Sequence, residues 1–179
     1  MGPVQLAAEF SAAEQAKDTL VRKKAISALE VLNEAYNYPR PSSFSRGMRL
    51  DIRGITILLI SGTASVDERG STVHPGDFRA QTWRTLQNIT ALLESEGASW
   101  KNVLRTTCYL RDIERDYSAF NEIRTQFYRE LGLDPLPAST GIQAILCRPD
   151  LLVEIEAIAV FDTDQAAPFD SKPAKVEEA

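Results

Sequence analysis

Histidine and cysteine are scarce in this chain of 179 residues, which has one histidine and two cysteines. Cys108 and Cys147 lie far apart in the sequence and form no C-x-x-C pair, so neither a disulfide framework nor a zinc site is indicated. His74 precedes Pro75-Gly76 without cysteine or acidic neighbours at ligand spacing. We therefore expect no metal site, an exposed loop at His74, and a reducing, cytoplasmic environment.

Excess positive charge and long apolar runs are also lacking. The chain has 20 Lys and Arg against 25 Asp and Glu, with a net charge of −5, whereas a nucleic-acid surface needs an excess of basic residues. No uninterrupted apolar run approaches the ~20 residues of a bilayer span, and the N-terminus lacks the order of a signal peptide. We expect neither nucleic acid nor a membrane as a partner.

What is present is the composition of an ordinary soluble domain, with 44% apolar and 25% charged residues. Ser11 and Glu14 form a capping-box pattern, and no Gly or Pro follows until after Tyr36, which predicts one long helix at residues 11–36. The polar C-terminal end has too little apolar surface to fold alone. We expect a helical extension and linker at residues 1–43, a folded domain at 44–163 and a disordered tail at 164–179.

The folded domain shows strand and helix signals in the order β-β-α-β-α-β-β, which places it in the α+β class. Apolar runs at 48–52 and 55–60 flank Arg53-Gly54 as a hairpin, with an expected end at Ser61-Gly62. Asp77 and Gly97 bound a first helix, and a strand at 100–110 follows. A second helix ends at Gly132, and two strands come after Pro137. The apolar stripe of this second helix is Phe120, Ile123, Phe127 and Leu131.

The last strand, residues 151–161, has two unlike faces. One face is entirely apolar and belongs to the core, whereas the other holds Glu154 and Glu156 among apolar side chains. A sheet with two helices on one side leaves this second face bare, and another subunit must cover it. The sequence therefore predicts an oligomer.

The two glutamates have two interpretations. A carboxylate at the edge of a subunit interface loses hydration, which raises its pKa and suits it to proton transfer near neutral pH. Alternatively, both pair with Arg or Lys across the sheet or the subunit boundary, as structural carboxylates commonly do. We favour the ion pair for Glu156 and leave both interpretations open for Glu154.

The folded domain also carries several short motifs. They are Ile60-Ser61-Gly62, Gln81 with Leu86 and Asn88, Asn121, Phe127, Leu136-Pro137-Ala138 and Val153-Glu154-Ile155-Glu156-Ala157. Over roughly residues 44–161 the chain resembles the Rid family of reactive-intermediate deaminases, also described as YjgF-like or endoribonuclease L-PSP-like. The resemblance implies a chorismate-mutase-like fold, assembled as a homotrimer whose sheets line a central barrel, with ligand sites in the clefts between subunits.

The resemblance also implies chemistry, because family members that act as deaminases hydrolyse enamines and imines of amino acids without metal or organic cofactor. They place an Arg at the position of Ser139, where it pairs with the substrate carboxylate, and a serine cannot form that charged fork. Phe44 likewise stands where an aromatic hydroxyl is often found. Ligand contacts are implied at Phe44, Ser61, Gly62, Asn121, Ser139, Thr140 and Gly141.

Each of these candidate residues also has a purely structural interpretation. Ser61-Gly62 either presents backbone groups to a ligand or lets the chain turn, and Asn121 either contacts the cleft or lies in the first turn of its helix. A polar strand start at Ser139 needs no function. Arg148 either replaces the missing Arg or is a turn residue beside Pro149, and Cys147 either lines the cleft or is a small core residue.

Residues 144–156 also resemble the end of the chorismatases, which hydrolyse chorismate on a related fold with a glutamate acid at the position of Glu154. We therefore expect a Rid-like, cofactor-independent hydrolase that acts on a small anionic metabolite, either an imine or enamine or a chorismate-like molecule. Glu154 would act as acid, base or water-orienting residue. The alternative is a non-catalytic trimer that binds a small ligand or serves as a scaffold.

Overall fold

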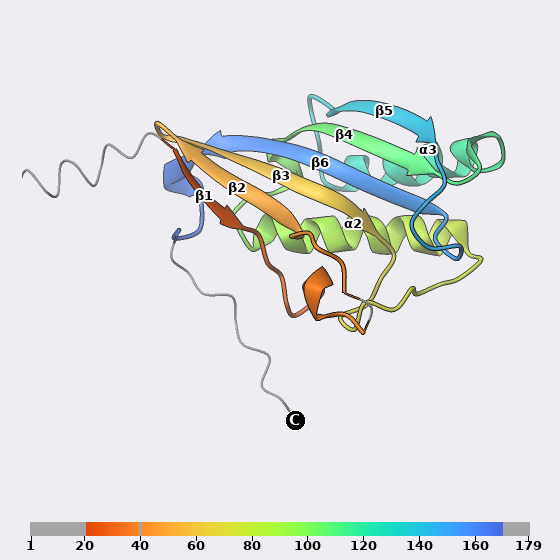
Figure 1. The fold of residues 1–179 in the computed structure, drawn as a ribbon. Coiled ribbons are helices and arrows are strands. Elements are labelled where there is room, and N and C mark those ends of the chain that lie inside the picture. Colours follow the sequence, from red (N-terminus) through yellow and green to blue (C-terminus); the bar gives the residue numbers. More distant parts are fainter. Residues whose placement is uncertain (1–20, 40, 170–179) are drawn as a thin grey trace, which may run out of the picture.

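Six strands form one sheet, and two helices cover one of its faces (Figure 1). The structure is a computed structural model that describes residues 21–39 and 41–169. The strands are β1 Arg22–Ala25, β2 Gly47–Ile52, β3 Ile55–Ala64, β4 Val103–Leu110, β5 Ala138–Gln143 and β6 Val153–Asp162. The helices are α2 Phe78–Glu94 and α3 Ile113–Glu130, with short 3-10 turns η1 Ala35–Asn37, η2 Trp100–Asn102 and η3 Thr163–Gln165.

The strand order in the sheet is β1-β2-β3-β6-β4-β5. All neighbours are antiparallel except β4 and β5, which run parallel. The last two strands of the chain are therefore not neighbours, because β6 inserts between β3 and β4 while β5 takes the far edge. The predicted α+β class and the order β-β-α-β-α-β-β are confirmed, with β1 added in front.

Both helices begin at an aspartate whose side chain accepts a hydrogen bond from the first turn. Asp77 caps α2 through the N–H of Ala80, and Asp112 caps α3 through the N–H of Arg115. Asn121 therefore lies in the middle of α3, and its interpretation as a first-turn residue is wrong. Neither helix of the described ranges is long and apolar enough to cross a bilayer.

The core lies between the helices and the inner face of the sheet. Every second residue of β6 from Val153 to Phe161 is exposed by 8% or less, as the alternation predicts. These side chains meet the inner faces of the helices, where Leu86 and Ile89 of α2 and Phe120 of α3 are also buried. The sheet thus presents β6, its central strand, to the core on one side and leaves the glutamates on the other.

The expected long helix near the N-terminus is wrong for residues 21–36, and its first part at 11–20 lies outside the described residues. Strand β1 instead pairs with the edge of β2, and Ile26 and Leu32 are fully buried. Lys24 Nζ also lies 3.1 Å from a carboxylate oxygen of the buried Glu96. These tertiary contacts override the helix propensity of an Ala, Leu, Lys and Glu-rich sequence.

The segment after β6 is packed through residue 169, in contrast to the expected tail from residue 164. The buried Arg49 donates a hydrogen bond to the carbonyl of Ala167 at 2.6 Å, and its guanidinium lies 5.3 Å from the ring centroid of Phe169. The N–H of Ala167 donates to the carbonyl of Glu96 at 3.0 Å. A buried guanidinium needs acceptors, and this segment supplies one.

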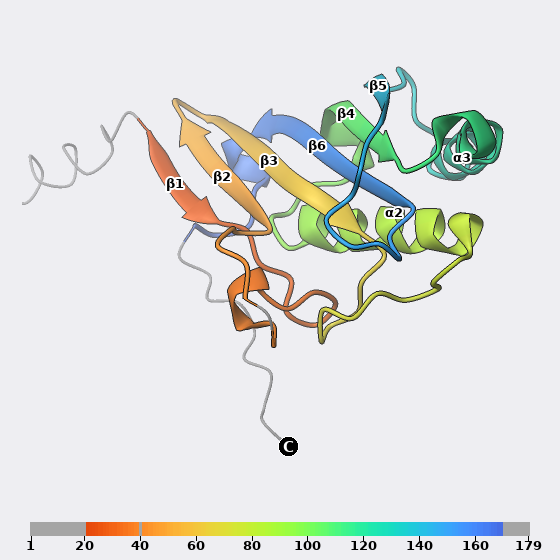
Figure 2. The ribbon, with the colours of Figure 1, turned by 45° about the vertical axis from the view of Figure 1, so that its right-hand side comes forward.

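The face of the sheet opposite the helices is open (Figures 1 and 2). Ile55, Leu59 and Ile158 lie on it and are 46%, 42% and 37% exposed. Leu59 and Ile158 are also cross-strand partners, so the apolar surface is continuous between β3 and β6. The structure therefore contains the bare, half-apolar face that the sequence predicts, whereas the subunit that would cover it stays a prediction.

Candidate active site

A β-bulge interrupts the pairing of β3 with β6 and shapes the open face. The register shifts by one residue between Ile60 and Thr63. Ser61 and Gly62 therefore stand opposite a single residue of β6, Glu156. The expected end of the strand at this point is wrong, because β3 continues past the bulge.

Glu154 lies on the open face directly beside this bulge. Its partners in the sheet are Ala64 of β3 on one side and Tyr109 of β4 on the other. Gly62 makes room for the carboxylate, because a Cβ at position 62 would lie 2.0 Å from Glu154 Oε1. The bulge thus presents bare backbone to a carboxylate, which gives Ser61-Gly62 a role beyond letting the chain turn.

The electrostatics of Glu154 differ from those of a solvated glutamate. Its side chain is half-buried and makes no hydrogen bond or ion pair within the described ranges. Burial, and after it the charge of Glu156, raise the pKa of Glu154 above its ordinary value. Glu156 has no ion-pair partner in the same part of the chain, so the ion pair expected for it is not found there. A carboxyl group that holds its proton more tightly is suited to acid or base work.

Tyr109 is a third ionisable group on this face, and sequence reasoning missed it. Burial raises the pKa of its phenol, and the charge of Glu156 and a hydrogen bond with it raise that pKa further. The ring packs against a small apolar cluster of Ala64, Leu146 and Leu151. Period-two alternation along β4 could have identified Tyr109, but only once β6 is known to lie beside β4.

The segment that leads into β2 lies along the bulge. Ser61 Oγ donates a hydrogen bond to the carbonyl of Ser45 at 2.8 Å, and the Ser61 N–H donates to the carbonyl of Arg46 at 3.0 Å. Phe44, next to Ser45, is 42% exposed, and the Arg46 guanidinium lies 5.4 Å from its ring centroid. The structure therefore brings together Ser61, Gly62 and Glu154, and it places Phe44 in the segment that runs along the bulge.

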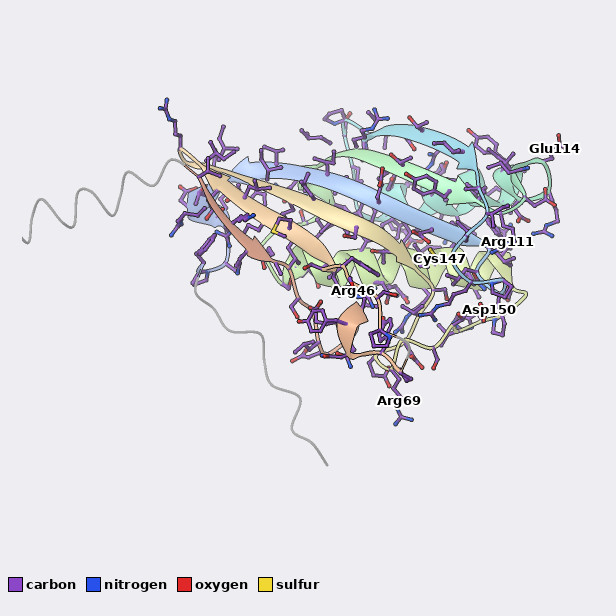
Figure 3. The ribbon with its side chains drawn as sticks, in the orientation of Figure 1. Arg46, Arg69, Arg111, Glu114, Cys147 and Asp150 are labelled. Carbon is purple, nitrogen blue, oxygen red and sulfur yellow. The ribbon has the colours of Figure 1, made fainter. Side chains whose placement is uncertain are left out.

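The loop between β5 and β6 carries Cys147 and Arg148. Arg148 donates hydrogen bonds to the carbonyl of Gly70 and to Thr72 Oγ1. Its guanidinium is therefore engaged with another loop, which favours its structural interpretation and leaves Ser139 without it. Cys147 is exposed, so the interpretation as a small core residue is wrong (Figure 3).

Two side chains hold this loop, and one of them, Gln81, belongs to the motifs that carry the family resemblance. The side chain of buried Gln81 donates to the carbonyl of Asp150 at 2.8 Å and accepts from the N–H of Leu152 at 2.8 Å. Arg111, at the end of β4, donates to three carbonyl groups of the same loop (Figure 3). The loop beside Glu154 is thus fixed from both α2 and β4.

Asn121 and Ser139 lie on the other side of the sheet from Glu154, against α3. Arg124 joins them, because its Nη1 donates to Ser139 Oγ at 2.9 Å and its Nη2 donates to Asn121 Oδ1 at 2.7 Å. Sequence reasoning missed Arg124, although its spacing of three from Asn121 on a helix is a usable signal. The predicted site residues therefore form two groups, separated by the sheet of one chain.

The other two candidate residues of β5, Thr140 and Gly141, lie on opposite faces of the sheet. Thr140 is in register with Thr107 and so shares the open face with Glu156, and Arg105 donates to its hydroxyl at 3.0 Å. Gly141 faces α3, where a Cβ would meet Tyr117 at 3.7 Å, an ordinary contact distance. Alternation along β5 therefore separates these residues.

Metal ligands do not gather in the described part of the chain, which holds no group of three or more His, Cys, Asp and Glu able to bind an ion. His74 is exposed, in a loop where its φ is 58°.

Comparison with known proteins places this geometry in a family. The sequence model described as endoribonuclease L-PSP matches residues 41–161, which is more than half of the chain. The chain belongs to the endoribonuclease L-PSP family. The predicted resemblance to Rid proteins is thereby confirmed.

Relatives of this chain are identical to it at about a third of the aligned positions. A RutC family protein of Pyrococcus horikoshii is 33% identical over 108 residues, which cover 60% of this chain and 82% of the relative. The 3-aminoacrylate deaminase RutC of Acinetobacter baylyi is 36% identical over 103 residues, which cover 58% of this chain and 78% of that enzyme. The family thus includes a small-molecule deaminase.

Solved structures of the L-PSP family share the fold. The YjgF gene product of E. coli has a TM-score of 0.61 and 26% identity, covering 76% of this chain and 98% of its own. E. coli TdcF with bound serine has a TM-score of 0.62 and 24% identity, covering 78% of this chain and 99% of its own. The latter likeness shows the fold alone.

Proposed function

We propose that the protein is a cofactor-independent hydrolase of small anionic imines or enamines, with Glu154 as its acid and base. The observation that carries the proposal is the placement of Glu154. Its carboxylate lies against the bare backbone of Gly62, without an ion-pair partner in the described ranges, and burial raises its pKa. The 3-aminoacrylate deaminase among the relatives supports this choice of substrate class.

The reaction with a protonated imine needs one group that moves a proton in both directions. Glu154 accepts a proton from a water molecule as the water oxygen bonds to the imine carbon, which gives a carbinolamine. Glu154 then returns the proton to the nitrogen, the C–N bond breaks, and ammonia leaves with the electron pair. The Glu154 carboxylate takes the proton of the hydroxyl group as the carbonyl forms and passes it to the departing ammonia, so ammonium is released and the carboxylate is restored. An enamine enters the same sequence after the protonated form of Glu154 donates its proton to the β-carbon, which gives the protonated imine and the Glu154 carboxylate.

The open face supports assembly into the homotrimer implied by the resemblance. Its exposed Ile55, Leu59 and Ile158 would be buried if three sheets faced one another, and burial of apolar surface favours association. Glu154 would then lie in a cleft between copies, where water is restricted. In this arrangement Ser139 of one copy and Glu154 of another could reach one ligand, although the sheet separates them within one chain.

A panel of small molecules tests the function. Thermal shift and product analysis would be applied to imines and enamines of small amino acids, beginning with 3-aminoacrylate, and to chorismate as a second substrate class. We expect ammonia and the matching carbonyl compound from an imine or enamine. A ligand that stabilises the protein and is recovered unchanged would instead support the binding or scaffold alternative, which the serine at position 139 favours. Conversion of chorismate would redirect the proposal to chorismatase-like chemistry.

A further inference from the structure

A cavity of about 410 Å³ lies between α3 and the chain that leads into β5. It is bounded by Arg124 and Arg129 from the helix and by Leu133, Leu136 and Pro137 from the following loop. Sites for small organic molecules have volumes of roughly 300–1,000 Å³. The cavity therefore has room for a small ligand, and it lies on the helix side of the sheet, away from Glu154.

The guanidinium of Arg124 is held in place by neutral groups. It donates to Ser139 Oγ and Asn121 Oδ1, and it lies 5.2 Å from the ring centroid of Phe120. Both hydrogen-bond acceptors are uncharged, so they orient the guanidinium without cancelling its charge. Arg124 is thus a preorganised cation at the wall of the cavity.

The charge of this wall is not balanced by carboxylates. Neither Arg124 nor Arg129 has an ion-pair partner within the ranges that the structure describes, although the chain as a whole has more acidic than basic residues. The nearby Glu122 pairs with Arg79 at 3.0 Å, and Glu130 accepts a hydrogen bond from Gln126. The acidic neighbours on the helix are therefore engaged elsewhere, and the cavity favours an anion.

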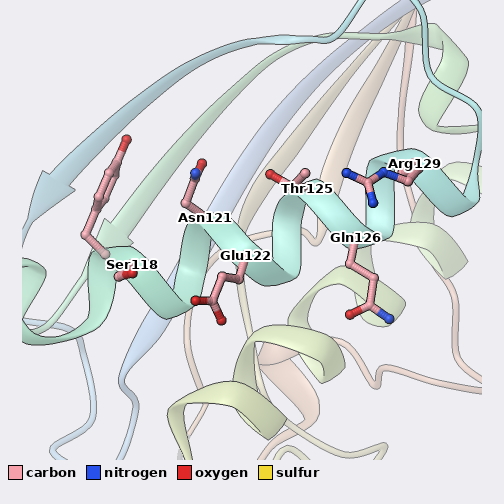
Figure 4. Close-up of a pocket in the computed structure, with 7 residues that line it drawn as sticks. Ser118, Asn121, Glu122, Thr125, Gln126 and Arg129 are labelled. Atoms are coloured by element: carbon pink, nitrogen blue, oxygen red, sulfur yellow. The ribbon is translucent and has the colours of Figure 1, made fainter.

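The polar groups follow one side of the helix. Asn121, Thr125 and Arg129 are spaced four residues apart on α3 and line this cavity. The same three residues also line a second, more open hollow beside it, which Figure 4 shows. The opposite wall is apolar, and Leu136 in it is 64% exposed without a covering partner in the described chain. A ligand that satisfies both walls carries an anionic group at one end and a short apolar body at the other.

We propose that this cavity is a binding site for a small organic carboxylate, with Arg124 as the partner of the carboxylate. A guanidinium matches the two oxygens of a carboxylate in a planar fork, and Leu133 and Leu136 would receive an aliphatic body of a few carbons. Ser139 acts as a positioning residue, because its hydroxyl holds Arg124. That the bound carboxylate belongs to a substrate rests on the proposed function, whereas the binding itself does not.

Binding of butanoate, measured by calorimetry and by NMR titration of the full chain, tests this site. Butanamide is the neutral probe of equal size, and inorganic phosphate is the anion without an apolar body. We expect butanoate to bind more tightly than either. Arg124→Gln should weaken butanoate binding about tenfold or more, because hydrogen bonds to charged groups are the strong ones. Arg124→Lys keeps the positive charge but loses the planar fork of the guanidinium. Its affinity for butanoate should therefore lie between those of the wild type and Arg124→Gln.

The matched control is Arg69→Gln, which removes the same charge from an exposed turn far from α3 (Figure 3). It should leave butanoate binding unchanged. Unaltered binding in Arg124→Gln, with an unchanged melting temperature, would overturn the proposal, as would a failure of the wild type to prefer butanoate over butanamide and phosphate. If the wild type binds butanoate through Arg124 but converts no imine, the hydrolase proposal alone falls.

Discussion

The carboxylate of Glu154 occupies the space that any side chain at Gly62 would need. A Cβ built on Gly62 lies 2.0 Å from Glu154 Oε1 and 3.0 Å from its carboxyl carbon. The bulge in β3 turns this stretch of backbone toward β6, and the absence of a side chain lets the carboxylate lie against it. The position of the proposed acid and base therefore depends on a glycine in a different strand.

Gly62→Ala should displace Glu154 and leave the fold intact. The atom that must move is the end of a flexible side chain, so we expect a change in the free energy of unfolding within about 1 kcal/mol. Turnover should fall by about 10²-fold, because small displacements of a reacting group are costly. Urea denaturation and steady-state kinetics measure the two effects.

Gly54→Ala is the control with the opposite outcome. No atom lies within 4 Å of a Cβ at this position, but its φ of 85° is unfavourable for a side chain. We expect a loss of about 1 kcal/mol of stability and unchanged turnover. Full turnover in Gly62→Ala would show that the close contact with Glu154 has no functional consequence.

Glu154→Gln should change the pH dependence of stability. Because the pKa of Glu154 is raised in the folded protein, the protonated side chain contributes to stability. This contribution is fully present below the pKa of the unfolded state, ordinarily 4.5. This contribution is lost as the pH rises through the folded pKa. The side chain of the Glu154→Gln variant stays uncharged at both pH values. The melting temperature of the variant should therefore equal that of the wild type near pH 4 and exceed it at pH 8. An offset that is the same at both pH values would contradict the raised pKa.

Gln81→Ala should destabilise the protein through the loop beside Glu154. The substitution leaves the carbonyl of Asp150 and the N–H of Leu152 without their partner in Gln81, at a part-buried place, and a polar group left unpaired away from water costs about 1–3 kcal/mol. We expect a loss of at least about 2 kcal/mol in urea denaturation. Gln87→Ala, at an exposed position of the same helix, should change stability by less than about 0.5 kcal/mol. Equal effects of the two variants would refute this account of the loop.

Leu59→Asp should prevent the proposed trimer. Leu59 is 42% exposed on the open face, whereas Leu131, at the end of α3, is 39% exposed outside it. Light scattering after size exclusion should give three times the chain mass of 19.9 kDa for the wild type and for Leu131→Asp. Leu59→Asp should elute as a monomer, because a charge on the buried face is unfavourable. If the wild type elutes as a monomer, the proposed trimer is contradicted.

Local patterns are enough to predict much of this fold. Alternation along residues 151–161 predicts both faces of β6, and Asp77 with Gly97 predicts the bounds of α2 closely, since caps and periodicity are properties of neighbouring residues. The prediction of an N-terminal helix is wrong because it used local patterns alone. Residues 22–25 form a strand through pairing with β2, which is distant in the sequence. Propensity carries no information about that partner.

The site shows the same division between local and distant information. Glu154 can be predicted, because a carboxylate on a half-apolar strand face is visible in the sequence. For Tyr109 and Arg124 the sequence carries only part of the signal: helical spacing relates Arg124 to Asn121, but the positions of Tyr109 beside Glu154 and of Arg124 beside Ser139 depend on strand order and on the packing of α3. The destination of Arg148, a loop at Gly70 and Thr72, likewise depends on tertiary structure.

The rate of imine or enamine hydrolysis by Glu154→Gln tests the central claim most directly. Glu114→Gln is the matched control, because Glu114 is exposed at the start of α3 (Figure 3). On the substrate that the panel identifies, Glu154→Gln should lose about 10²–10⁴-fold in kcat while keeping the wild-type oligomeric state, and Glu114→Gln should keep full activity. Wild-type kcat in Glu154→Gln would contradict the account.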